Sequence, residues 1–338
     1  MAPDRHAATN HDQERIRGDA RQDEHVTAMR PRLRIATRAS ELALWQSRYV
    51  ASALEQAWPG LGTELVTLTT TGDRILDRPL AEVGGKGLFV KELETALLEQ
   101  RAELAVHSMK DVPWDLPSGL IIAAILAREN PADVLVSHGG GALDALAQGA
   151  RIGTSSVRRR AQLLALRDDV AVLDLRGNVT TRLARWRRGD YDAIVLAAAG
   201  LRRLALSDAD CHTLSTQIML PAIGQGAIGI ECRADDASTL KLVAVLNDAS
   251  SARCVAAERA LSAHLGSSCT LPVAGLARLV DDELILEGLV ASVDGRDVVR
   301  QTARGPLARA TELGNELGEH LLAAGAARIL ARDGVINH

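Results

Sequence analysis

Short apolar runs alternate with helical patterns along most of the chain. Segments typical of β-strands occur at residues 33–37, 64–71, 104–106, 120–126, 151–153, 170–175, 192–197 and 221–230. Helical spacing of apolar residues occurs at 42–54, 90–100, 198–204, 237–247 and 250–265. This alternation predicts an α/β architecture. Residues 273–305 predict three more strands and residues 306–331 a helical segment, which indicates a small α+β domain.

The stretch from Leu104 to Pro113 is the strongest candidate for chemistry. Its apolar start predicts a buried strand, and the polar residues His107, Lys110 and Asp111 follow. Because ligands of open α/β sheets bind beyond the carboxyl ends of strands, Lys110 and Asp111 fall where a site is expected. An acid beside a lysine could exchange protons with a substrate. A structural ion pair or a loop cap is the alternative that this stretch alone leaves open.

Length and composition limit the class of protein. A chain of 338 residues is long enough for two or three domains, and its hydrophobic content of 47% supports packed cores. The net charge of −4 gives no overall attraction to nucleic acid or membranes, and no apolar run approaches the roughly 20 residues of a membrane helix. The four cysteines show no CxxC or zinc spacing and no secretory signal is present, so we expect reduced thiols in the cytoplasm.

The first 31 residues differ from the rest of the chain. They contain five Arg and six Asp or Glu without a periodic apolar pattern, which predicts a disordered N-terminal extension. Met29 stands just before the first predicted strand, so we hypothesise that translation starts there. N-terminal sequencing of native protein that begins at residue 1 would contradict this hypothesis.

Arginine has largely replaced lysine. Only four of the 39 basic residues are lysines, and Lys86, Lys91 and Lys110 lie close together around the single phenylalanine, Phe89. Glycines at 84, 85 and 87 flank Lys86 without the spacing of a phosphate-binding loop. The pattern favours a mobile glycine hinge that carries a lysine.

Residues 151–188 hold ten arginines and three aspartates. Arg158 and Arg159 begin a predicted helix, where cations oppose the helix dipole, and this placement suggests that a bound anion offsets the cost. Arg176 and Arg182 follow the next predicted strand, and forked guanidiniums suit carboxylates or phosphates. The chain has seven aromatic residues, too few for interleaved base stacking, so a small polyanion is favoured over nucleic acid. A basic surface helix is the other alternative.

Two further positions stand out by their setting. Arg38 follows the first predicted strand and precedes a helix that Ser40 can cap, near the donor-rich helix start. A solvated loop charge is the alternative for Arg38. Cys269 lies in a polar loop of small residues, accessible for covalent attachment, although most lone cysteines are small buried hydrophobes.

Six ordered motifs give the chain a specific resemblance to a known family. They are Arg-Ile-Ala-Thr-Arg-x-Ser (34–40), Gly-Gly-Lys-Gly-Leu-Phe-Val-Lys-Glu-Leu-Glu (84–94), His-Ser-Met-Lys-Asp-Val-Pro (107–113), Gly-Thr-Ser-Ser-Val-Arg-Arg (153–159), Leu-Arg-Gly-Asn-Val-Thr-Thr-Arg-Leu (175–183) and Leu-Pro-Ala-Ile-Gly-Gln-Gly (220–226). From about residue 32 to the last predicted helix, the sequence resembles the porphobilinogen deaminase (hydroxymethylbilane synthase) family.

The resemblance implies a fold and an activity. The implied fold is α/β, with two periplasmic-binding-protein-like lobes, a central cleft and a small α+β C-terminal domain. We expect domain 1 at 32–127 and 226–247, domain 2 at 128–225 and domain 3 at 248–338. The implied reaction condenses four porphobilinogen molecules head to tail into hydroxymethylbilane, with release of ammonia. The growing chain is carried on a dipyrromethane cofactor held by a thioether.

Position by position, the resemblance implies roles for individual residues. Asp111 matches the catalytic carboxylate, suited to stabilise the cationic azafulvene left by departing ammonia and to move protons. Cys269 matches the thiol that attaches dipyrromethane, and Lys86 and Phe89 match a mobile loop. The residues implied to hold the cofactor's carboxylates are Lys110, Thr154, Ser156, Arg158 and Arg159. Those implied to bind substrate carboxylates are Arg38, Ser40, Gln46, Arg176, Arg182 and Arg203. No metal is expected.

The sequence departs from the family pattern at two places, and two other functions compete with the implied one. Ser267 and Ser268 stand where the family usually has two glycines, which puts cofactor loading in question, and Glu82 stands where some members have lysine. A non-catalytic anion-binding module and a nucleic-acid binder with strongly salt-dependent affinity are the alternatives. The missing secretory signal and a carboxylate among cationic groups favour the enzyme. We expect porphobilinogen as partner, no nucleic acid or membrane, a monomer, and a cytoplasmic location.

Overall fold

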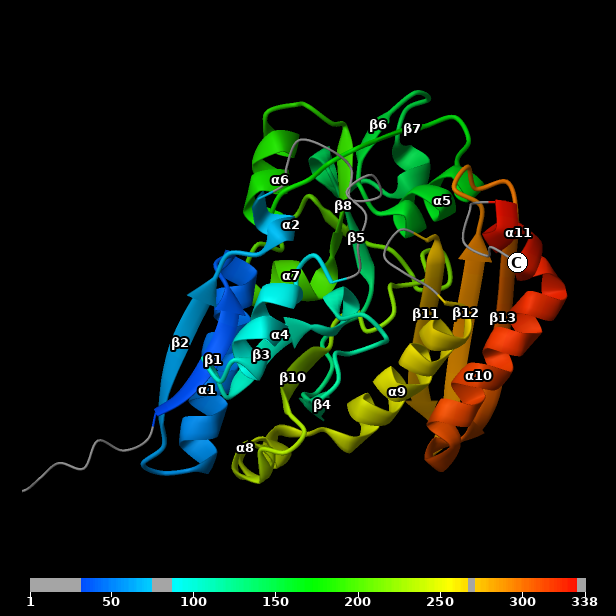
Figure 1. Cartoon of the computed structure of the whole chain (residues 1–338). Helices are drawn as coiled ribbons and strands as arrows, with labels where there is room; N and C mark the ends of the chain where they lie inside the picture. The colour runs from blue at the N-terminus through cyan, green and yellow to red at the C-terminus, as the bar shows by residue number, and fades with distance from the viewer. Residues whose placement is uncertain (1–31, 75–86, 267–270, 333–338) are drawn as a thin grey trace, which may run out of the picture. The chain divides into compact units, whose positions relative to one another are not determined.

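Three sheets organise the computed structural model, which describes residues 32–74, 87–266 and 271–332 (Figure 1). The first sheet, sheet A, has the strand order β2-β1-β3-β10-β4. Its strands are β1 (Arg32–Arg38), β2 (Gly62–Leu68), β3 (Leu104–Ser108), β4 (Leu120–Ile125) and β10 (Ile228–Arg233). β1 runs parallel to β2 and β3, whereas β10 runs antiparallel to β3 and β4.

The second sheet, sheet B, repeats this arrangement in the order β7-β6-β8-β5-β9. Its strands are β5 (Asp133–Ser137), β6 (Arg151–Gly153), β7 (Ala171–Leu173), β8 (Ala193–Ala197) and β9 (Cys211–Thr213). β6 is parallel to β7 and β8, and β5 is antiparallel to β8 and β9. In both sheets, therefore, three parallel strands are followed by an antiparallel strand and an edge strand.

Helices follow the strands of both sheets. Those of sheet A are α1 (Glu41–Ala57), α2 (Thr71–Arg74), α4 (Lys91–Leu98) and α8 (Ala237–Val243), and those of sheet B are α5 (Val157–Leu166), α6 (Val179–Arg187) and α7 (Ala198–Arg203). The Ser40 hydroxyl accepts a hydrogen bond from the Ala43 amide and starts α1, as expected for a serine cap. α1 buries Val50 and Leu54 against sheet A, and each such side chain contributes roughly 1.5–3 kcal/mol.

The C-terminal region has a sheet of its own, sheet C. It contains β11 (Val273–Val280), β12 (Glu283–Ala291) and β13 (Val298–Pro306), all antiparallel, with α9 (Ala249–His264), α10 (Ala310–Leu321) and α11 (Ala327–Arg332). α9 and α10 pack on the sheet around Leu261, Leu286 and Leu317. Gly325, with φ of +113°, separates the helical segments that the sequence predicted as one.

Two chain segments, 126–132 and 214–227, connect sheets A and B, and they are joined to each other by hydrogen bonds. The Glu129 amide donates to the Gly226 carbonyl, and the Gln225 amide side chain donates to the Pro131 carbonyl. Gly226 has φ of +89°, and a Cβ there would lie 2.3 Å from the Glu129 carbonyl oxygen. Only glycine fits this position, because the left-handed conformation and the backbone contact both exclude a side chain.

Most predicted strands are present, with two differences. The strand predicted at 221–230 begins only at Ile228, because Gly224 and Gly226 adopt positive φ and form turns. The strands β5 and β9 were not predicted. The predicted extension at 1–31 lies outside the described residues. Within the described residues, no helix is long and apolar enough to cross a membrane.

Candidate active site

Asp111 ends a short helical turn that continues directly from β3. The strand finishes at Ser108, and residues Met109–Asp111 form a 3₁₀ turn. One carboxylate oxygen of Asp111 lies 3.9 Å from an Arg38 nitrogen, and its side chain is 33% exposed. The carboxylate thus combines a fixed backbone position with access to solvent, as a catalytic group requires.

Arg38 is held from three sides. Its guanidinium pairs with Asp73, approaches Asp111, and lies 4.3 Å from the centre of the Phe89 ring. Phe89 packs over Gly72, where a Cβ would come within 2.3 Å of the ring. Asp73 is itself fixed by the Thr70 hydroxyl at 2.7 Å. Phe89 thus positions Arg38, and its place in a mobile loop stays a prediction.

Further cations surround Asp111. Removal from water lowers the pKa of Arg182 to about 10, Arg159 and Arg176 act in the same direction, and Asp111 opposes them. The Lys110 side chain reaches solvent, yet desolvation by nearby protein, followed by Arg159, lowers the pKa of Lys110 to about 8. Opposite charges and like charges therefore meet around one carboxylate, an arrangement typical of functional sites.

Arg158 and Arg159 share one buried carboxylate. Asp133, the first residue of β5, accepts from Arg158 at 2.8 Å and from Arg159 at 2.7 Å. The guanidiniums also donate to the carbonyls of Leu220 and Val195. Burial alone would raise the pKa of Asp133, but the two arginines hold it well below its usual value. The pair keeps one net positive charge.

The turn between β6 and α5 carries three hydroxyls. Thr154 is 2% exposed and accepts from the Ser156 amide, and Ser156 caps α5 by accepting from the Arg159 amide. The Ser155 hydroxyl oxygen is buried and has no hydrogen-bond partner among the described residues. This turn therefore offers an unused donor beside Arg158 and Arg159.

Three predicted substrate-binding residues make structural contacts. Gln46 is 2% exposed and donates to the Ser108 hydroxyl at 2.9 Å, so it supports the end of β3. Ser40 caps α1. Arg203 donates to the Gly226 carbonyl at 2.8 Å and lies 5.8 Å from the Trp45 ring centre, which ties α7 to the connecting segment.

Several predicted positions lie outside the described residues. These are the attachment cysteine and loop lysine, Cys269 and Lys86, and the residues at the two departures from the family pattern, Glu82 and the pair Ser267 and Ser268. Arg176 is described and follows β7, where it contributes to the charge around Arg182.

Two residues of this region were not assigned from the sequence. Asp73 fixes Arg38, and Asp133 fixes Arg158 and Arg159. The only sequence signal for Asp133 is an acid that opens an apolar run at residues 133–136. Such an acid stands out because a buried carboxylate needs a cationic partner.

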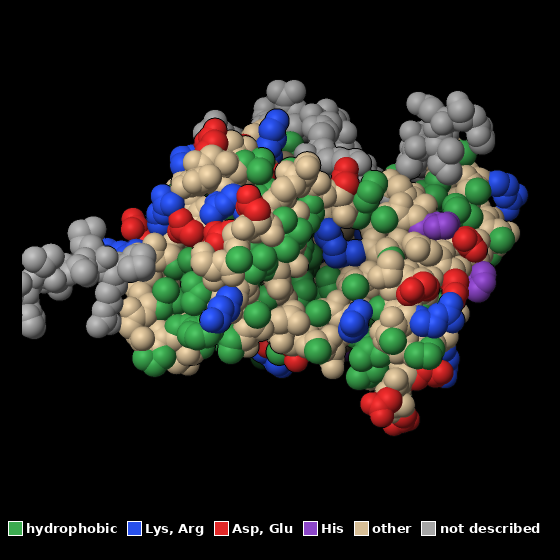
Figure 2. Space-filling model, turned by 60° about the horizontal axis from the view of Figure 1, so that its bottom comes forward, with side chains coloured by type: hydrophobic (Ala, Val, Ile, Leu, Met, Phe, Trp, Pro, Cys, Tyr) green, Lys and Arg blue, Asp and Glu red, His purple; other side chains and the backbone are tan. Residues whose placement is uncertain are grey.

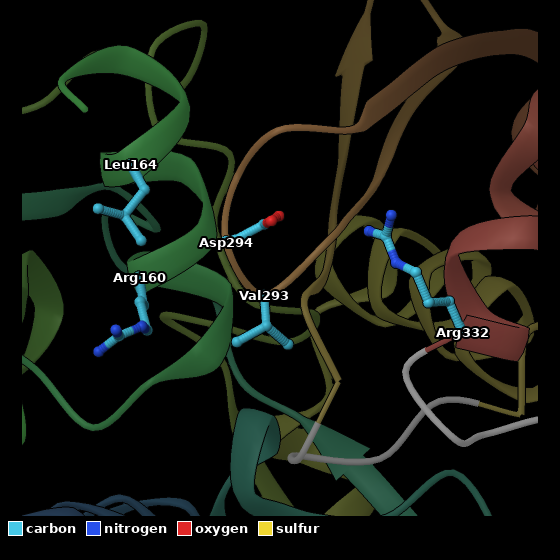
Figure 3. Close-up of a pocket in the computed structure, with 5 residues that line it drawn as sticks. All are labelled: Arg160, Leu164, Val293, Asp294 and Arg332. Carbon is cyan, nitrogen blue, oxygen red and sulfur yellow. The ribbon is translucent and has the colours of Figure 1, made fainter.

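A large cavity lies away from these groups. About 440 Å³ in volume, it is lined by Arg160 and Leu164 of α5, Val293 and Asp294 after β12, and Arg332 (Figure 3). None of the predicted site residues that the structure describes lines it. Within the described residues, no group of three or more His, Cys, Asp or Glu side chains is placed to hold a metal ion.

The chain matches one protein family along most of its length. Residues 33–241 match the family described as "Porphobilinogen deaminase, dipyromethane cofactor binding domain", and residues 252–323 match "Porphobilinogen deaminase, C-terminal domain". The porphobilinogen deaminase of Syntrophotalea carbinolica is 54% identical over 299 residues, covering 88% of this chain and 95% of that protein.

Solved structures show a more distant likeness. The periplasmic VFT2 domain of BvgS from Bordetella pertussis has a TM-score of 0.38 at 15% identity, covering 64% of this chain and 87% of that one. YhfZ from Shigella flexneri has a TM-score of 0.33 at 16% identity, covering 70% and 98%. These likenesses are too weak to define the lobes of this chain. The two lobes are defined by the strand arrangement of sheets A and B.

The strand order and the charged groups define a class: a two-lobed α/β protein with a carboxylate set among arginines. The chain belongs to the porphobilinogen deaminase family. It is a transferase of tetrapyrrole biosynthesis that condenses porphobilinogen into hydroxymethylbilane and uses a dipyrromethane cofactor. The resemblance inferred from the six motifs is thereby confirmed.

Proposed function

We propose that Asp111 is the catalytic carboxylate of this chain. The observation that supports it is the position of Asp111 at the end of β3, solvent-accessible and next to Arg38 and Arg182. When ammonia leaves the aminomethyl group of porphobilinogen, the remaining azafulvene is cationic, and a carboxylate at hydrogen-bond distance stabilises it. The same carboxylate can take up and return protons at the pyrrole nitrogen.

The surrounding cations bind the carboxylates of the substrate. Six cationic groups face three carboxylates, which leaves three positive charges; the cations are Arg38, Lys110, Arg158, Arg159, Arg176 and Arg182, and the carboxylates are Asp73, Asp111 and Asp133. Each porphobilinogen brings two carboxylates, so the excess suits a polycarboxylate chain. Ser40, Gln46 and Arg203 also hold the backbone around these cations, and their part in binding substrate carboxylates stays a prediction from the family resemblance.

The described residues fit a dipyrromethane. Lys110, the unpartnered Ser155 hydroxyl and the shared pair Arg158 and Arg159 offer donors and net positive charge to its carboxylates. Thr154 and Ser156 fix the turn that presents these donors. When bound, dipyrromethane supplies the pyrrole carbon to which the first substrate unit is joined. Cys269 is proposed as its attachment point from the family resemblance.

The three sheets support the proposed division into domain 1 (32–127 and 226–247), domain 2 (128–225) and domain 3 (248–338). On the face in Figure 2, Lys and Arg side chains are dispersed among acidic and apolar ones, which supports a small-molecule substrate over nucleic acid. The net charge of −4 supports the same choice. A cytoplasmic monomer, without nucleic acid or membrane as partner, completes the proposal.

Asp111→Asn tests the proposal, with Asp168→Asn on the exposed surface as the matched control. We expect porphobilinogen turnover to fall by about 10²–10⁴-fold in Asp111→Asn and to stay unchanged in the control. Intact-mass analysis with peptide mapping should show two pyrrole units on Cys269 in both variants. Normal turnover in Asp111→Asn would contradict the catalytic role, and a bare Cys269 thiol after incubation with porphobilinogen would contradict the attachment.

A further inference from the structure

A second cavity lies behind the turn that carries Asp111. It has a volume of about 400 Å³ and lies between β4, α9, the start of α10 and the segment that leaves the turn. Its walls are mainly apolar, with Met109, Ile122, Ile125, Val255 and Ala260 among them. Met109 lines this cavity, whereas Asp111, two residues later, faces Arg38. The size falls in the range of small-molecule sites.

Among the described residues that line this cavity, one is charged. Arg259 of α9 donates to the carbonyls of Val112 at 3.3 Å and Trp114 at 3.1 Å. A guanidinium has five N–H donors, so these two contacts leave three. The carboxylates of Glu231 and Asp115 attract Arg259, and Glu231 is bonded to His107. Burial lowers the pKa of Arg259, and the attraction of Glu231 and Asp115 offsets this effect only in part.

The rest of the lining limits the shape of a ligand. α9 presents Ala252, Ala256, Ala260 and Ala263 to the cavity, a flat and small-residue wall. Asn247 is occupied, because its side-chain oxygen accepts from the Ile125 amide. A planar apolar body with one carboxylate is therefore complementary to these walls and to Arg259.

We propose that this cavity is a second ligand site, which binds a small aromatic monocarboxylate through Arg259. The ring lies between the alanines of α9 and Met109, and the carboxylate pairs with the guanidinium. The same guanidinium holds residues 112 and 114, directly after Asp111, so a bound ligand acts on the turn that carries the catalytic carboxylate. The site is separate from the arginines that bind porphobilinogen.

Calorimetric titration of the cofactor-loaded protein with 2-naphthoate tests the proposal. We expect saturable binding, with 2-naphthamide as a neutral analogue at least about 10-fold weaker. Arg259→Met keeps an unbranched apolar stem but removes the guanidinium, and it should weaken 2-naphthoate binding by about 10- to 100-fold. Arg253→Met, an exposed position on the same helix, is the matched control and should leave the affinity unchanged.

A second variant separates shape from charge. Ala256→Phe fills the cavity without changing charge, so it should remove binding of both naphthalene compounds, and thermal unfolding shows whether each variant is folded. The proposal would be overturned if 2-naphthoate did not bind at millimolar concentration, or if the acid and the amide bound equally well. It would also be overturned if Arg259→Met and Ala256→Phe left binding intact while Arg176→Met removed it, because 2-naphthoate would then occupy the porphobilinogen site. The readout is binding, so these results leave the role of Asp111 untouched.

Discussion

Sheets A and B share one pattern of parallel and antiparallel strands but bury opposite kinds of residue at equivalent places. In sheet A, β10 pairs with the end of β3 through Ile228 and Ser108, and in sheet B, β5 pairs with the end of β8 through Asp133 and Ala197. Asp133 therefore occupies the place of Ile228. The acid of sheet A, Asp111, lies instead in the turn beyond the strand, exposed to solvent.

A second exchange runs the other way. Counting from the same end pairs, His107 and Glu231 of sheet A occupy the places of Leu196 and Val136 in sheet B. His107 bonds Glu231 at 2.8 Å, and both side chains are almost fully buried. One pattern of parallel and antiparallel strands thus supports a buried polar pair at either of two levels, so the chemistry of each lobe lies in a few side chains and not in its strand pattern.

The largest expected effect comes from breaking the buried pair of sheet B. Asp133→Asn leaves Arg158 and Arg159 buried without a carboxylate, which should lower the free energy of unfolding by about 3–5 kcal/mol. Urea unfolding measures the change. Asp192→Asn, which breaks the exposed pair with Arg151, is the control and should cost less than about 1 kcal/mol. Equal effects of the two substitutions would contradict the structural role of Asp133.

Sheet A can be given the residues of sheet B. His107→Leu alone leaves Glu231 buried without its partner and should cost about 3 kcal/mol or more in unfolding free energy. The double variant His107→Leu with Glu231→Val removes both partners and should recover most of that loss, since apolar replacement of a buried pair is often neutral. A double variant less stable than the single one would show that the pair does more than satisfy the hydrogen bond between its two members.

Glu94 of α4 makes the same cluster sensitive to pH. Desolvation, followed by repulsion from Glu231, raises the pKa of Glu94 to about 7 from 4.5. Between these values the folded state binds more protons than the unfolded state, so the free energy of unfolding falls as pH rises through this window. Glu94→Gln removes this loss, and its stability relative to the parent should be about 1–3 kcal/mol greater at pH 8 than at pH 5. Identical pH profiles of the two proteins would exclude this linkage.

The smallest effect is expected from the partner of Arg38. Asp73→Asn is the same substitution as Asp133→Asn, but the Asp73 side chain is 24% exposed and its arginine retains Asp111 nearby. We expect a loss of about 1 kcal/mol or less in urea unfolding, because water replaces much of the lost interaction. A loss as large as that of Asp133→Asn would show that the exposure of the carboxylate does not decide the cost of removing its charge.

Local patterns predicted the strands and turns of the site but not its pairings. The apolar run before His107 and the serines before α1 and α5 are signals within a few residues, and the structure contains each of these elements. Asp133 and its arginines are 25 and 26 residues apart, so no local spacing indicates that they meet. The start of β10 was predicted too early, because the turns at Gly224 and Gly226 depend on contacts with Met109 and Glu129 far away in the sequence.

The position of β10 has a consequence for synthesis on the ribosome. Sheet B takes its strands from one uninterrupted stretch, Asp133 to Thr213, whereas sheet A needs β10, Ile228–Arg233, between β3 and β4. Until that strand has been made, β3 and β4 lack the neighbour that joins them, and β4 has no other strand in the sheet to pair with. The second lobe can therefore complete its sheet first, although the first lobe is begun earlier.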